Sequence, residues 1–126
     1  MTKITKENYQ AYTAINVVAF SYAFAGAMGE GGALYILSAS KEMHHINTIK
    51  SGLTKEQIWE ICPPLKHCEF GIFGKGKIPE GWSMYYLGMG NHFVIKDTYK
   101  KEVMPNIDNM EGFEIFLCWK TLICTD

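Results

Sequence analysis

The stretch VVAFSYAFAGAMGEGGALYILSAS, residues 17–40, decides the fold class. Both of its ends are rich in β-branched, aromatic and aliphatic residues, a composition typical of buried strands. Between them, GAMGEGG interrupts the apolar pattern, and glycine supplies the turn conformations that other residues avoid. The stretch therefore predicts a β-hairpin, with strands over 17–24 and 33–40 joined by a glycine turn.

The residues before this hairpin predict a helix. Thr5 is a suitable N-cap, and Tyr9, Tyr12, Ile15 and Val18 follow at three-residue spacing. Side chains three or four positions apart share one face of a helix. We therefore expect an N-terminal helix that carries its aromatic residues on one side.

The segment after the hairpin, KEMHHINTIKSG over 41–52, has a weaker pattern. Met43, Ile46 and Ile49 also recur every third residue. This spacing predicts a short exposed helix or a turn before Gly52.

A sharper signal lies between residues 53 and 64. Thr54 and Gln57 have the spacing of a capping box, in which each side chain bonds the backbone N–H of the other residue. Leu53 and Ile58 flank the cap as a hydrophobic staple. A helix is predicted to begin here and to end before the prolines at 63 and 64, because proline cannot continue it.

The second half of the chain predicts further strands over 69–73, 82–88 and 91–97, separated by glycine and proline. The tail, residues 108–123, fits two structures. Phe113, Ile115, Leu117 and Trp119 alternate as in a strand, whereas Asp108 with Glu111 opens a helix whose face is Met110, Phe113 and Leu117. We favour the helix. The prediction is an α+β fold in a single domain over 1–126.

Composition limits the classes of function. The chain has 126 residues at 14.3 kDa, enough for one hydrophobic core. All 12 basic residues are lysines, so the chain has no arginine. The planar arginine guanidinium makes the bidentate hydrogen bonds by which proteins recognise phosphates and guanine edges, so we expect no nucleic-acid partner. Residues 8–29 are uncharged, but polar side chains interrupt them too often for a membrane span.

The cysteines form two C-x5-C pairs, Cys62 with Cys68 and Cys118 with Cys124. Structural zinc sites usually space their ligands by two to four residues, so we expect no metal. No secretory signal is visible, so the prediction is mostly buried thiols in a reducing, cytoplasmic setting.

Catalytic motifs are incomplete. GIFGKGKI, residues 71–78, resembles a phosphate-binding loop, but Ile78 replaces the Ser or Thr that would ligate magnesium. No nucleophile elbow, metalloprotease helix or paired-carboxylate site is present. We expect a protein that is not an enzyme and needs no cofactor.

The order of these segments resembles that of a divergent profilin. The matching pieces are Tyr9-Gln10 with Tyr12, the glycines from 29 to 32, Tyr35 with Ser38, and YLGMGNHFVIKD over 86–97. The likeness covers about the first 100 residues, and the tail departs from it because too few residues remain for the family's last strands and helix.

The resemblance implies a profilin-like fold, with a central antiparallel sheet flanked by N- and C-terminal helices on one face. It also implies binding of monomeric actin, or an actin-like protein, and regulation of its assembly. The residues that match the family's actin contacts are Val94, Lys96, Lys100 and Lys101.

The family also binds proline-rich peptides between its terminal helices. Tyr9, Tyr12 and Tyr35 match one wall of that site, and Trp119 is the candidate for the other wall. A weak contact with anionic lipid is implied as well, and the lack of arginine weakens it further. The rival interpretation is a small α+β regulatory or ligand-binding domain of the roadblock type, which forms a dimer.

Overall fold

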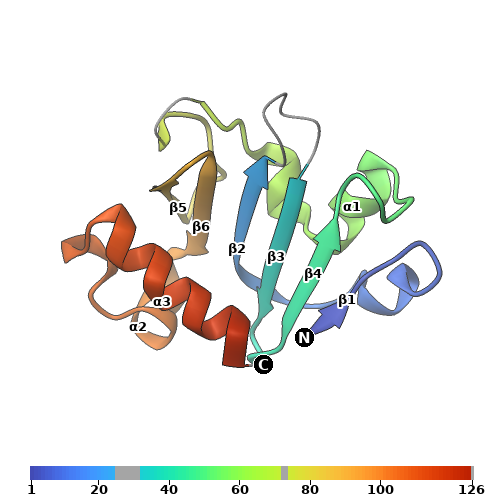
Figure 1. Ribbon diagram of the computed structural model, residues 1–126, viewed down its shortest axis with the longest axis horizontal. Helices are drawn as coiled ribbons and strands as arrows, with labels where there is room; N and C mark the ends of the chain where they lie inside the picture. Colours follow the sequence, from blue (N-terminus) through green and yellow to red (C-terminus); the bar gives the residue numbers. More distant parts are fainter. Residues whose placement is uncertain (25–31, 72–73, 126) are drawn as a thin grey trace.

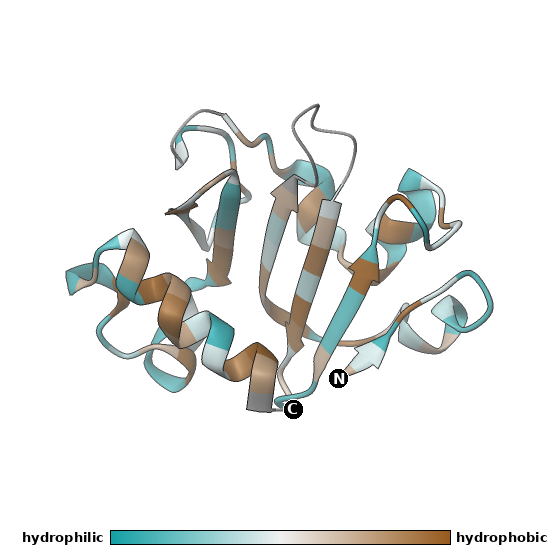
Figure 2. Cartoon of the chain, viewed as in Figure 1, coloured by the Kyte–Doolittle hydropathy of each residue, from teal (hydrophilic) through white to brown (hydrophobic). Residues whose placement is uncertain are grey.

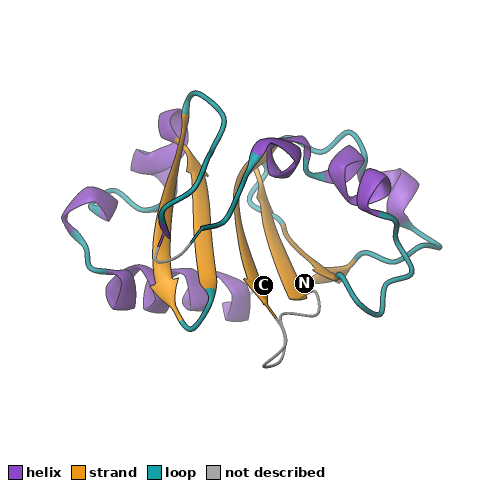
Figure 3. Cartoon of the chain, turned by 90° about the horizontal axis from the view of Figure 1, so that it is seen from above, coloured by secondary structure: helices purple, strands orange, loops and turns teal. Residues whose placement is uncertain are grey.

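The computed structural model describes residues 1–24, 32–71 and 74–125, and these form one layer of sheet with helices on both sides (Figure 1, Figure 3). The strands are β1 (Thr2–Lys3), β2 (Val17–Phe24), β3 (Gly32–Ser38), β4 (Met43–Asn47), β5 (Trp82–Gly88) and β6 (Asn91–Lys96). The α-helices are α1 (Lys55–Ile61), α2 (Lys100–Val103) and α3 (Gly112–Thr125). The 3-10 helices are η1 (Tyr9–Tyr12), η2 (Pro63–His67), η4 (Asp97–Tyr99) and η5 (Ile107–Asn109).

The predicted hairpin is confirmed. β2 and β3 pair antiparallel, with Phe20 opposite Ile36, while the glycine turn lies outside the described residues. On its other edge β2 pairs with β6, which gives the order β1-β4-β3-β2-β6-β5. The α+β class is therefore correct. The sheet is mixed and not wholly antiparallel, because β1 runs parallel to β4.

The N-terminal helix is much shorter than predicted. Only the four residues of η1 are helical, and Val18 belongs to β2. Val17 and Val18 are β-branched, and β2 is bonded to a strand on each side, so sheet pairing outweighs the helical spacing.

Of the two structures predicted for residues 41–52, the helix is wrong, and the turn before Gly52 is present at residues 48–50. Residues 43–47 form β4, in which Met43 and Ile46 are both buried but pack in different core clusters. An odd spacing of three places side chains on opposite faces of a strand, so it also fits a strand that is covered on both faces. Ile49 lies past the strand and is exposed.

The capped helix is confirmed as α1. The Gln57 N–H donates to Oγ1 of Thr54 at 3.1 Å, and the Thr54 N–H donates to Oε1 of Gln57 at 2.8 Å. Leu53 and Ile58 are buried in the same cluster, as a hydrophobic staple requires.

The tail is a helix, as favoured, but its start differs. The Glu111 N–H donates to the Glu114 carboxylate at 3.0 Å. Asp108 instead accepts a hydrogen bond from the Tyr85 hydroxyl at 2.6 Å. Of the strand predicted over 69–73, the described residues show one bridge, Glu69 with Lys77, and residues 72 and 73 lie outside the description.

The two faces of the sheet carry separate cores. One core joins η1 and α1 to β2, β3 and β4 through side chains such as Phe20, Ile36 and Ile61. The other joins α3 to β6 and β2 through Phe93, Ile115 and Trp119. We expected the terminal helices on one face, and the structure corrects this: the N-terminal helical turn and α3 lie on opposite faces (Figure 3).

Candidate functional site

The predicted actin-contact residues do not form one exposed surface. Val94 is 0% exposed in the core of β6, so the expectation that it touches a partner is wrong. Lys96 is half-buried at the end of β6, opposite Trp82 on β5. Of the four residues, only Lys101 is fully exposed.

Lys100 is engaged within the chain. Its ammonium lies 3.3 Å from Asp108 and 3.5 Å from Asp97, and it stands over the ring of Tyr85. The hydrogen bonds with Tyr85 and with Asp108 raise the pKa of Lys100. Hydrogen bonds from Tyr85 and from Lys100 lower the pKa of Asp108. This cluster connects η4, α2 and η5 to β5. The ammonium of Lys100 is therefore already paired within the chain.

The four aromatic residues predicted to bind proline-rich peptides are divided between the faces. Tyr9 and Tyr12 pack against the core beneath η1, whereas Tyr35 and Trp119 belong to the core beneath α3. Trp119 is 2% exposed, and its indole N–H donates to the Ser21 hydroxyl at 2.7 Å. The residues therefore do not line a single groove, because the sheet separates them.

The histidines and cysteines do not assemble a reactive centre among the described residues. The ring of His92 is buried, and its Nε2 lies 3.1 Å from the Gly71 carbonyl oxygen. Cys62 is buried and burial raises its pKa, while burial raises the pKa of Cys68 to about 11. Cys118 and Cys124 are exposed, contrary to the expectation of mostly buried thiols. No three ligand-type side chains meet in the described part of the chain.

The most unusual surface is the outer face of α3. Phe113 is 68% exposed and Leu117 is 47% exposed, one helical turn apart. The inner face, with Ile115 and Trp119, is already buried against the sheet. Figure 2 shows hydrophobic segments along most of this helix. A helix that is apolar around its circumference is usually buried on every side.

Two hollows flank this helix. A hollow of about 680 Å³ lies between α3 and the segment after α2, with Met104, Met110 and Cys118 in its wall. A second, of about 250 Å³, lies between α3 and the sheet, where Tyr35, Phe116 and Ile123 meet. We call the ridge of Phe113 and Leu117, together with these two hollows, the α3 surface.

The sequence pattern predicts the helix but not which of its faces is exposed. Met110, Phe113 and Leu117 were predicted to share one face of the helix, and the structure shows that Phe113 and Leu117 are exposed. Ile115, Trp119 and Leu122 form a competing apolar face at the same helical spacing. Periodicity could not choose between two apolar faces, although the presence of both was itself a signal of a second contact surface.

Comparison of the chain with family models, curated proteins and solved structures gives no match. In the part of the chain that the structure describes, no helix has the length and apolar character needed to cross a bilayer. The functional proposal therefore rests on the α3 surface and on the sequence resemblance.

Proposed function

We propose that this chain is a non-catalytic protein-binding domain and that the α3 surface is where its partner binds. The observation that carries the proposal is the pair of large apolar side chains, Phe113 and Leu117, exposed one turn apart on a helix whose other side is already packed. Fully burying an aromatic or leucine side chain contributes roughly 1.5–3 kcal/mol, so covering both would give a partner a substantial anchor.

The surroundings of the ridge have the composition of an interface. Glu114, Lys120 and Thr121 are exposed beside it, so an apolar centre is bordered by polar groups. Protein interfaces commonly have such an apolar centre and polar rim, and aromatic anchors in them carry much of the binding energy. The hollows on either side give a partner's side chains room to enter.

An actin-like monomer is the partner that the sequence resemblance favours. The segment over 86–97 and the order of the elements support it, and Lys101 supplies an exposed positive charge two residues before Val103, which lines the larger hollow. Lysine on the rim would favour encounter with an acidic protein surface.

A second candidate is a homodimer, as in the roadblock-type interpretation. The same ridge favours it, because a two-fold contact through α3 would cover Phe113 and Leu117 on both copies at once. The size of the free protein in solution separates the two candidates.

The test compares two charge substitutions at exposed apolar residues. Leu117→Glu lies in the α3 surface, whereas Ile49→Glu changes a residue of similar exposure, 53%, in the loop after β4. We expect the wild type and Ile49→Glu to slow polymerisation of pyrene-labelled actin, and Leu117→Glu to lose most of that effect. Polymerisation that the wild type leaves unchanged would argue against an actin partner. Equal loss in both variants would argue against the α3 surface.

A further inference from the structure

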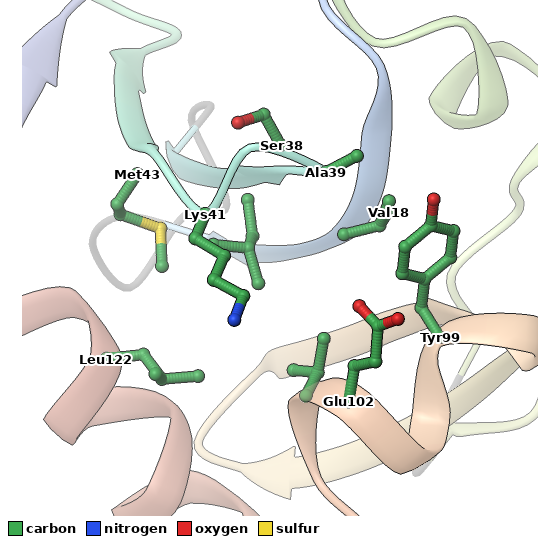
Figure 4. Close-up of a pocket in the computed structure, with 10 residues that line it drawn as sticks. Val18, Ser38, Ala39, Lys41, Met43, Tyr99, Glu102 and Leu122 are labelled. Atoms are coloured by element: carbon green, nitrogen blue, oxygen red, sulfur yellow. The ribbon is translucent and has the colours of Figure 1, made fainter.

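A pocket of about 370 Å³ lies where the β3–β4 turn approaches α2 and α3 (Figure 4), and Val103 and Leu122 line both this pocket and the larger hollow of the α3 surface. Its floor is apolar, formed mainly by Val18, Leu37, Met43, Val103 and Leu122. It lies on the inner side of α3, whereas Phe113 and Leu117 lie on the outer side, and neither of those two residues lines it. Its volume is in the range of small-molecule sites.

Two opposite charges enter this pocket from different elements. Lys41 reaches in from the β3–β4 turn and Glu102 from α2, and Figure 4 shows the amine and the carboxylate directed into the same space. Among the described residues the ion pairs are those of Lys100 with Asp97 and Asp108, so Lys41 and Glu102 pair neither with each other nor elsewhere.

The neighbouring charges do not neutralise these two groups. Glu42, next to Lys41, accepts a hydrogen bond from the Ser40 hydroxyl at 3.2 Å. Lys100, two residues before Glu102, is held by its own acidic partners. The Lys41 ammonium and the Glu102 carboxylate are therefore both exposed and available above the apolar floor of the pocket.

The backbone of Lys41 supports a positioned side chain. Its φ is +67°, a left-handed conformation that favours glycine or asparagine, yet a lysine occupies it. The turn is held by the Lys41 N–H, which donates to the Ser38 carbonyl at 2.9 Å, and by the Glu42 N–H, which donates to the Ser38 hydroxyl at 3.1 Å. These bonds hold the backbone of the turn from which the Lys41 side chain extends.

We propose that this pocket binds a free α-amino acid with an apolar side chain. The ligand's carboxylate would meet Lys41 and its ammonium would meet Glu102, while its side chain would fill the space lined by Val18, Met43 and Leu122. Both groups are exposed, so a ligand with one charge would make one of the two charge-assisted contacts and forgo the other. A zwitterion satisfies both.

The experiment is calorimetric titration of the full chain with L-leucine, N-acetyl-L-leucine and L-leucinamide. The acetylated compound lacks the ammonium and the amide lacks the carboxylate. We expect saturable binding of L-leucine, and binding weaker by about tenfold or more for each analogue, since hydrogen bonds to charged groups carry this much energy.

Two variants assign the charges, and a third is the control. Glu102→Gln should bind L-leucine and N-acetyl-L-leucine with equal affinity, because the partner of the ligand's ammonium is lost. Lys41→Met should bind L-leucine and L-leucinamide with equal affinity, because the partner of the ligand's carboxylate is lost. Lys101→Met, on the same helix but outside the pocket, should bind as the wild type does. The proposal is overturned if L-leucine gives no saturable heat up to about 10 mM, because a dissociation constant above that concentration corresponds to less than about 3 kcal/mol of binding free energy. It is also overturned if both analogues bind equally well, or if both pocket variants retain wild-type affinity.

Discussion

Replacing Trp119 with phenylalanine tests how α3 is held on the sheet. The indole N–H and the Ser21 hydroxyl form a hydrogen bond between residues 98 positions apart, and the indole ring packs 4.7 Å from the ring of Phe93. Trp119 is 2% exposed and Ser21 is 4% exposed, so removing the indole N–H takes a partner from a buried hydroxyl.

The expected cost has two parts. Leaving the Ser21 hydroxyl buried without its donor costs about 1–3 kcal/mol. The smaller phenyl ring leaves a void beside Phe93, which adds about 1 kcal/mol or more. We therefore expect Trp119→Phe to lower the free energy of unfolding by about 2–4 kcal/mol.

A double-mutant cycle with Ser21→Ala isolates the hydrogen bond. Once the hydroxyl is absent, the Trp119→Phe change no longer leaves an unsatisfied group, so the double variant should lose about 1–2 kcal/mol less than the sum of the two single variants. Urea unfolding followed by far-UV circular dichroism measures all four proteins. Additivity within about 0.5 kcal/mol would refute the claim that this bond holds α3 to the sheet.

Three further predictions follow from the described contacts. Gly112→Ala should destabilise the chain by about 1–3 kcal/mol in urea unfolding although alanine is the better helix former, because its Cβ would overlap the carbonyl oxygen of Tyr86; a stabilised variant would contradict this. Asp108→Asn should lower stability at pH 7, because the Tyr85 hydroxyl and Lys100 lower the pKa of this carboxyl. The stability that a depressed pKa contributes is fully present above the ordinary value of 3.8 and is lost as the pH falls through the lowered value, so the difference from wild type should shrink as the pH falls below about 3.8, and a constant difference would count against the cluster. A polyproline peptide should leave the tryptophan emission unchanged, and a saturable change that Trp119→Phe abolishes would show that the two sets of aromatic residues do share a groove.

Local signals in the sequence predicted part of this fold. The capping box of Thr54 and Gln57 depends only on residues close in the sequence. The pairing of 17–24 with 33–38 depends on a short connection. Both features could therefore be predicted from the local sequence pattern. The three-residue spacing of Met43 and Ile46 was misleading because β4 is buried on both faces. Periodicity separates helix from strand only when one face is polar.

The site was harder to predict than the fold. Val94 was assigned to a partner surface from its place in a resembling segment, but β6 lies inside the sheet, between β2 and β5. Tyr12 was assigned to a peptide groove from the family resemblance, with Trp119 as the candidate for the opposite wall, yet the sheet lies between them. The topology decides on which face of the sheet a helix packs. The exposed ridge of α3 can be identified only when the buried side of the helix is known.

Sedimentation velocity of the chain, alone and mixed with monomeric actin, tests most directly whether the α3 surface binds a protein. The proposal predicts either a dimer of the 14.3 kDa chain on its own or, in the mixture, a complex that sediments faster than each free protein, and Leu117→Glu should abolish that species while Ile49→Glu preserves it. A wild-type chain that sediments as a monomer in both samples would contradict both partners proposed for this surface. A larger species that Leu117→Glu leaves intact would place the contact elsewhere on the molecule.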